Sequence, residues 1–164
     1  MENTQNRDPK LCHDAIRDFW NRERELIKEG KGTRDWTLQQ QIEIMNFKPG
    51  RGGERKDANA PTDVNGKAYE GHHMKSAEAY PQYQGRGDNI QALTRDEHLA
   101  AHAGGFHKPT NGYYNPETGA TTEFGDAEPA QPEPVELSQP YIETVEYKYI
   151  IAGEVESAPD CGIG

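Results

Sequence analysis

The chain has few large aliphatic side chains with which to build a core. Leucine, isoleucine, valine and phenylalanine together supply 23 of its 164 residues, a share below the roughly 20% that, with high charge, is typical of disordered chains. Glycine and proline are common by comparison, with 17 and 11 residues. We therefore expect the folded part to need a metal, a partner or both for its stability.

Two further absences exclude whole classes of protein. No apolar run approaches the roughly 18 residues of a membrane-spanning helix, and the first ten residues lack the apolar stretch of a secretory signal peptide. The two cysteines, Cys12 and Cys161, are far apart in the sequence. They form neither a disulfide framework nor a Cys-x-x-Cys site.

The net charge of −10 is concentrated in the C-terminal part of the chain. Residues 1–124 hold 17 basic and 19 acidic residues, whereas residues 125–164 hold one lysine and nine acids. Surfaces that bind nucleic acid are normally basic, so this balance counts modestly against a polyanionic ligand. A bound metal cation would supply local positive potential.

The periodicity of the sequence predicts an α+β protein. Residues 10–29 have apolar side chains at helical spacing, with Asp8 as the expected N-cap and Gly30 after the last turn. The next expected elements are a short helix from a capping box at Thr37 to Asn46, a loop at 48–63, and an Asn65-Gly66 hairpin between strands 62–64 and 67–70. An irregular loop at 74–88, a strand at 89–93 and a capped helix from Thr94 to Gly104 are expected to follow. The last expected elements are a turn-rich segment at 106–124, an extended linker at 126–140 and a strand at 141–152.

Five of the six histidines lie within 36 residues, where uniform scatter would place roughly 1.3. His98 and His102 are four residues apart on a predicted helix, so both imidazoles lie on one face, as two ligands of one ion require. His72 and His73 follow each other at the end of a predicted strand, and neighbouring strand residues point to opposite faces. Only one of them joins the helical pair easily, and the other is free for a different task.

This pattern favours a catalytic metal site over two simpler alternatives. Three imidazoles leave coordination positions open for water and a phosphate, and a fourth imidazole, with a pKa of about 6.5, suits a general base. A structural zinc site would need one more ligand and would have no use for the fourth imidazole. A solvated helix face is the plainest interpretation of an isolated His-x-x-x-His pair.

Taken together, the motifs resemble the ββα-metal motif of HNH nucleases. The matching residues are Gly71-His72-His73, Asp88-Asn89-Ile90, Glu97-His98 and His102. Residues 70–105 are similar to GHH-signature HNH/endonuclease VII-superfamily toxins of bacterial polymorphic toxin systems, and more distantly to DNase colicins. The resemblance extends over residues 33–119.

The resemblance implies a role for each matching residue. It implies metal ligation by His72, His98 and His102, a general base at His73, and a bracing residue at Asn89 that holds the hairpin and so orients the base. The implied reaction is hydrolysis of DNA to 5′-phosphate and 3′-hydroxyl ends with one divalent metal ion. Imidazole ligands favour Zn²⁺ or Ni²⁺, whereas the family also uses Mg²⁺ or Mn²⁺.

The resemblance also implies an organisation and a biological setting. We expect an N-terminal amphipathic helix region at 1–32, a small ββα-metal (HNH, His-Me finger) nuclease domain at 33–124, and an acidic Pro/Glu-rich linker and C-terminal strand at 125–164. An antibacterial toxin of this kind would be exported by a specialised secretion system, act in the target-cell cytoplasm and be neutralised by a cognate immunity protein. An RNase, a phage or mobile-element HNH nuclease, and a non-catalytic zinc-stabilised interaction module are the rival functions.

Several other residues have two interpretations each. Four cations near the motif, Lys67, Lys75, Arg86 and Arg95, are candidates for binding phosphates or are ordinary solvated charges. His107 is either a fourth metal ligand, a DNA contact or a surface residue. Tyr113 and Tyr114 either stack on bases or pack on the hairpin. Trp20 and Trp36 are expected in the core. For residues 125–164 the options are a solubilising tail, a DNA mimic that shields the site, and a strand added to a sheet edge.

Overall fold

The computed structural model describes residues 6–46, 49–50, 53–54 and 60–141. Over this range the chain is a small α+β protein, as predicted, with three α-helices and four two-stranded antiparallel sheets. The helices are α1 (Pro9–Lys28), α2 (Leu38–Met45) and α3 (Arg95–Ala101). The sheets pair β1 (Lys31–Gly32) with β8 (Val135–Glu136), β2 (Pro49–Gly50) with β3 (Gly53–Glu54), β4 (Glu70–His73) with β5 (Ile90–Leu93), and β6 (Gly112–Tyr114) with β7 (Thr121–Glu123). Two 3₁₀ helices, η2 (Pro81–Tyr83) and η3 (Gly87–Asn89), lie between β4 and β5.

The capping signals place the three helices correctly. The Asp8 side chain accepts a backbone N–H of the first turn of α1, and Gly30 follows the helix with φ of +80°. The capping boxes that begin at Thr37 and Thr94 are both formed. One apolar side chain of the predicted helix is not buried, since Leu11 in the first turn of α1 is 41% exposed.

The structure also corrects the strands. The hairpin expected around Asn65-Gly66 is reduced to a turn with a single bridge between Thr62 and Ala68, because a two-residue turn alone does not stabilise a ladder. The segment expected to be loop at 48–63 contains β2 and β3, and the turn-rich segment at 106–124 contains the β6–β7 hairpin. Except for its first residue, the strand expected at 141–152 lies outside the described residues.

An apolar core lies between α1, α2 and β5. Its buried members are Ala15, Phe19, Trp20, Ile27, Trp36, Ile44, Ile90, Ala92 and Leu137. Both tryptophans are therefore in the core, as expected. The buried carboxylate of Glu23 accepts hydrogen bonds from Trp36 Nε1 at 2.7 Å and Thr33 N at 2.7 Å, which joins α1 to the start of α2. In the described part of the chain, no helix has the length and apolar content to cross a bilayer.

Residues 125–141 fold back onto the body and are called the strap below. β8 pairs with β1, and Leu137 enters the core. The Asp35 carboxylate accepts the backbone N–H of Ser138 at 2.8 Å, and the Gln139 carboxamide accepts the backbone N–H of Leu38 at 2.9 Å. This part of the acidic segment is thus attached to the fold along much of its length.

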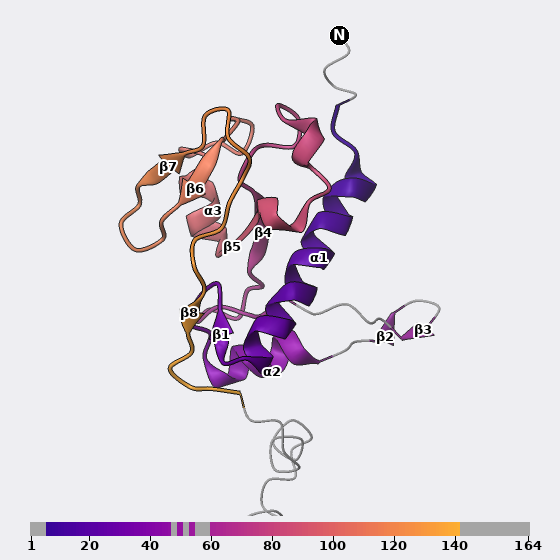
Figure 1. Ribbon diagram of the computed structural model, residues 1–164, viewed down its shortest axis with the longest axis vertical. Helices are drawn as coiled ribbons and strands as arrows, with labels where there is room; N and C mark the ends of the chain where they lie inside the picture. Colours follow the sequence, from indigo (N-terminus) through magenta and orange to yellow (C-terminus); the bar gives the residue numbers. More distant parts are fainter. Residues whose placement is uncertain (1–5, 47–48, 51–52, 55–59, 142–164) are drawn as a thin grey trace, which may run out of the picture.

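The β4–β5 hairpin lies between α1 and α3 (Figure 1). Gly71 faces α1 so closely that a Cβ atom there would lie 2.9 Å from Cγ1 of Ile16. On the other face, Glu70 and His72 contact α3 through the imidazole of His98. The two faces of β4 therefore contact two different helices, α1 and α3.

The contact between Gly71 and α1 gives a first prediction. Gly71→Ala should lower the free energy of unfolding by about 1–3 kcal/mol, because the new methyl overlaps Ile16. In the double variant Gly71→Ala/Ile16→Ala, the loss of the methyl overlap should recover part of that free energy. Urea unfolding of both single variants and of the double variant measures this. Gly85→Ala is the control, since its Cβ would lie 3.4 Å from the nearest atom. Strict additivity of the two changes would contradict the contact.

The strap gives a second prediction. Leu137→Ala should lower the free energy of unfolding by about 2–4 kcal/mol, because it leaves a cavity in the core. Val135→Ala, also on the strap but 42% exposed, should change it by less than about 1 kcal/mol. Urea denaturation compares the two variants. Equal, small effects would show that the strap is not anchored in the core.

Candidate metal centre

Three histidines meet between β4 and the end of α3. One ligand atom from each of His72, His98 and His102 lies within 4.8 Å of the other two, and the ring centroids are 4.9–5.1 Å apart. The helix ends directly after this site, because Ala103 and Gly104 have φ of +54° and +89°. These three histidines are the ones that the sequence predicted as ligands, and they are positioned to bind a metal ion.

Hydrogen bonds to neighbouring groups fix the protonation of two of these rings. The Nδ1–H of His98 donates to Glu70 Oε1 at 2.8 Å, and the Nδ1–H of His102 donates to the backbone oxygen of Lys108 at 2.7 Å. A carboxylate and a carbonyl only accept, so Nδ1 of each ring is the donor. Nε2 of each ring makes neither of these bonds and is left for a metal, which is the usual arrangement of histidine ligands.

The third imidazole is the most buried of the three. His72 is 1% exposed, and its buried Nδ1 has no hydrogen-bond partner among the described residues. Burial, followed by the nearby His98 and His102, lowers the pKa of His72 to about 2, so the ring is neutral. Burial also lowers the pKa of His98, although Glu70 opposes this. A buried, neutral imidazole with an unsatisfied nitrogen, next to two half-buried imidazoles, fits a cation well.

His73 points to the opposite face of β4, toward α1, and takes no part in the cluster of three. Its Nε2–H donates to the backbone oxygen of Gln84 at 3.0 Å, so its Nδ1 carries a lone pair. Burial lowers the pKa of His73; the Gln84 hydrogen bond raises it, and the nearby Arg7 lowers it. The prediction that only one of the paired histidines joins the helical pair is thus confirmed.

The fully buried side chain of Asn89, directly before β5, is hydrogen-bonded to the segment that follows β4. Its Oδ1 accepts the backbone N–H of Lys75 at 2.9 Å, and its Nδ2 donates to the backbone oxygens of Lys75 at 3.0 Å and Tyr83 at 3.3 Å. These bonds hold the chain after His73 against the start of β5.

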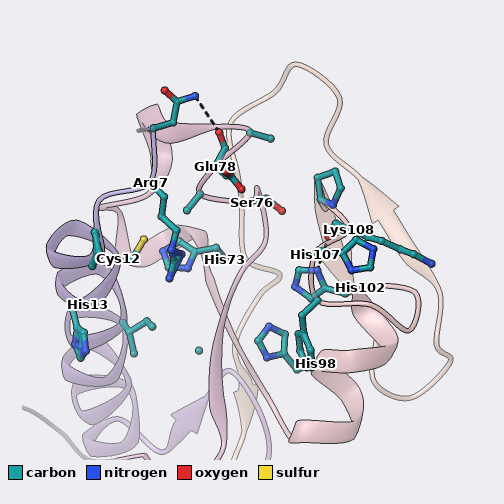
Figure 2. A pocket seen from close by; sticks show the side chains of 18 residues that line it. Arg7, Cys12, His13, His73, Ser76, Glu78, His98, His102, His107 and Lys108 are labelled. Carbon is teal, nitrogen blue, oxygen red and sulfur yellow. Dashed lines mark hydrogen bonds between the residues drawn. The ribbon is translucent and has the colours of Figure 1, made fainter. Parts of the chain in front are cut away.

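A cavity of about 900 Å³ separates α1 from the α3 side of the molecule (Figure 2). Its histidines are His13, His73, His98, His102 and His107. Arg7 and Lys108 add positive charge, and Glu78 is the one carboxylate among the described residues that line it. The strap contributes no residue to the lining, so residues 125–141 do not shield the site as a DNA mimic would.

The cations expected to bind phosphates lie elsewhere. Lys75 is only 2% exposed; its Nζ donates to the Gly125 backbone oxygen at 2.8 Å and lies 4.5 Å from the ring centre of Tyr80. This corrects the expectation for Lys75, because a buried, bonded ammonium has no free side for a phosphate. Arg86 forms ion pairs with Asp88 at 2.8 Å and Glu128 at 3.1 Å, outside the cavity.

The remaining candidates lie at or beyond the margin of the site. Arg95 pairs with Glu70 at 3.3 Å and lies over the Phe106 ring at 4.5 Å. The exposed Lys67 shares a separate depression with Arg95. His107 lines the cavity but is not among the three clustered rings. Neither of the paired tyrosines, Tyr113 and the buried Tyr114, lines the cavity.

Sequence reasoning missed three residues of the site. Glu70 carried a usable signal, since the period of two on a strand places it on the same face as His72. Arg7 and Gln84 carried none, because their places depend on contacts between distant segments. Comparison with protein-family models, with curated proteins and with solved structures gave no match. What the site does must therefore be inferred from its own geometry.

The bond between Glu70 and His98 gives a third prediction. Glu70→Gln should weaken Zn²⁺ binding about 10- to 100-fold, because the carboxylate orients His98 and raises the basicity of its ring. Calorimetric titration of the metal-free protein measures this. Glu78→Gln, which alters a cavity carboxylate away from the three rings, is the control. Equal affinities for the two variants would contradict an orienting role for Glu70.

Proposed function

We propose that the protein is a metal-dependent endonuclease that hydrolyses DNA phosphodiester bonds, with β4, β5 and α3 forming a ββα-metal unit of the HNH type. The observation that carries the proposal is that the two kinds of histidine are hydrogen-bonded through different ring nitrogens. His98 and His102 are bonded through Nδ1, which leaves Nε2 for a metal, whereas His73 is bonded through Nε2, which leaves Nδ1 for a proton. All three rings line one cavity. The motif resemblance supports the same assignment.

Each residue has a defined task in this reaction. His72, His98 and His102 would hold a divalent ion, which would supply Lewis-acid chemistry for the phosphate and the leaving 3′-oxygen. His73 Nδ1 accepts a proton from the attacking water. The Gln84 carbonyl, bonded to Nε2–H, then stabilises the imidazolium. Asn89 holds the backbone of Lys75, two residues after His73, in place.

The electrostatics of the cavity support a polyanionic substrate. Among the described residues of the lining, Arg7 and Lys108 carry positive charge and Glu78 carries negative charge, so the local balance is positive although the chain is acidic. A role as an antibacterial toxin effector, exported and held inactive by an immunity protein, is proposed on the motif resemblance alone. RNA is the second candidate substrate, since a phosphodiester is its reacting group as well.

A fourth prediction tests the reaction. His73→Ala should lower plasmid cleavage by about 10²- to 10⁴-fold, because it removes the general base. Melting temperature and metal affinity should stay close to those of the wild type, since His73 is not a ligand. Cleavage is measured with EDTA and with Mg²⁺, Mn²⁺, Ni²⁺ or Zn²⁺ added back, on plasmid and on structured RNA.

His98→Ala is the control for the loss of the metal. His98→Ala should lose both cleavage and the metal-dependent rise in melting temperature. A wild-type protein that binds metal and gains stability, yet cuts neither DNA nor RNA, would replace the nuclease with a metal-stabilised interaction module. Cleavage of RNA alone would change the substrate class and keep the mechanism.

A further inference from the structure

One buried carboxamide connects the N-terminal segment to the cavity wall. Gln84 is 5% exposed. Its Oε1 accepts the backbone N–H of Asp8 at 2.7 Å, and its Nε2 donates to the backbone oxygen of Asn6 at 2.9 Å. The peptide groups on both sides of Arg7 are therefore bonded to the same side chain. The thiol of Cys12 is also within reach of Oε1, at 3.7 Å.

The backbone of Gln84 has a second task at the same place. Its carbonyl oxygen accepts the Nε2–H of His73 at 3.0 Å. A single residue thus holds His73 through its main chain and the flanks of Arg7 through its side chain. Both Arg7 and His73 line the cavity opposite α3, as Figure 2 shows.

We propose that Gln84 is a positioning residue, which fixes Arg7 at a set place beside His73 so that the guanidinium binds a substrate phosphate. The proposal rests on the nuclease function and names the residue that holds the phosphate. Arg7 is exposed and precedes α1, so no helical bonds hold it in place. Its planar fork of donors matches a phosphate in two-point contact.

Gln84 matters for binding because it orders the exposed segment formed by residues 6–8. Besides the Gln84 bonds, the side-chain amide of Asn6 donates to the backbone oxygen of Glu78 at 3.4 Å. Without the Gln84 carboxamide, residues 6–8 lose both of their shorter contacts to the cavity wall, and Arg7 samples more conformations. Small misplacement of a substrate-binding group lowers turnover strongly, by about 10²-fold for an error near 1 Å.

The test compares Gln84→Leu, Gln84→Glu, Arg7→Gln and the double variant Arg7→Gln/Gln84→Leu. The leucine removes the three polar contacts of the side chain, whereas the glutamate keeps an acceptor for Asp8. Gln41→Leu is the matched control, because Gln41 is also buried and bonded to backbone, at Trp36 and Gln139, but does not line the cavity. The readouts are kcat and KM on a DNA oligonucleotide, and hydrogen exchange of the Asp8 amide by NMR.

Gln84→Leu should lower kcat about 10- to 100-fold and accelerate exchange of the Asp8 amide at least about 10-fold. Gln84→Glu should have smaller effects on kcat and on the exchange of the Asp8 amide than Gln84→Leu. In the double variant the loss should stay well below the product of the single losses, because Gln84 acts partly through Arg7. Gln41→Leu should lower the melting temperature and leave kcat unchanged.

Two results would overturn the proposal. One is an equal loss of kcat in Gln84→Leu and Gln41→Leu, and the other is full additivity of the Arg7 and Gln84 changes. If the wild type does not cut, the nuclease proposal fails separately, and binding of a fluorescent oligonucleotide in EDTA decides this one. Gln84→Leu and Arg7→Gln should then weaken binding to a similar extent, and unchanged binding in both variants would refute a phosphate contact at Arg7.

Discussion

The alternation of side chains along β4 is the constraint on which the rest of the site depends. Neighbouring residues of an extended strand point to opposite faces, so His72 is directed to α3 and His73 to α1. This requires a helix against each face of a two-stranded sheet, and Gly71 permits α1 to approach that closely. The cavity lies between the same two helices. Clustered imidazoles and a separate, differently protonated imidazole thus share one space without competing for one position.

A chain with so few large aliphatic residues holds this arrangement with two kinds of contact. Away from the site, tryptophans and a few aliphatic side chains form the core, and the strap completes it with Leu137. Around the site, buried polar side chains with hydrogen-bond partners replace apolar packing; Gln84 and Asn89 are the main examples. Satisfied polar networks specify geometry more sharply than apolar contacts do. The part of the fold that must be exact for chemistry is therefore the part built from polar contacts.

The sequence predicted what local patterns encode. Helix caps at Asp8, Thr37 and Thr94 were correct. Spacing placed His98 and His102 on one helix face and left one of His72 and His73 to join them, and the motif resemblance gave that place to His72. What could not be predicted depends on contacts between distant segments: Arg34 with Glu97 in two parallel hydrogen bonds, Gln84 with the segment before α1, and Asp35 with Ser138. Such pairs leave no periodic trace. Lys75 shows the same limit, because its closeness to the motif in sequence indicated a phosphate contact, whereas folding buries it beneath Gly125.

The charge distribution gains a physical explanation from these contacts. Lys75 and Arg86 attach to residues at the start of the strap, Gly125 and Glu128, so two cations that flank the motif fasten the acidic segment outside the cavity. Among its described lining residues, the cavity has the cations Arg7 and Lys108 and a single carboxylate, Glu78. At physiological ionic strength exposed charges act over about 8 Å, so a substrate in the cavity responds to this local set more than to the net charge of −10. An acidic chain and a site for a polyanion are therefore compatible.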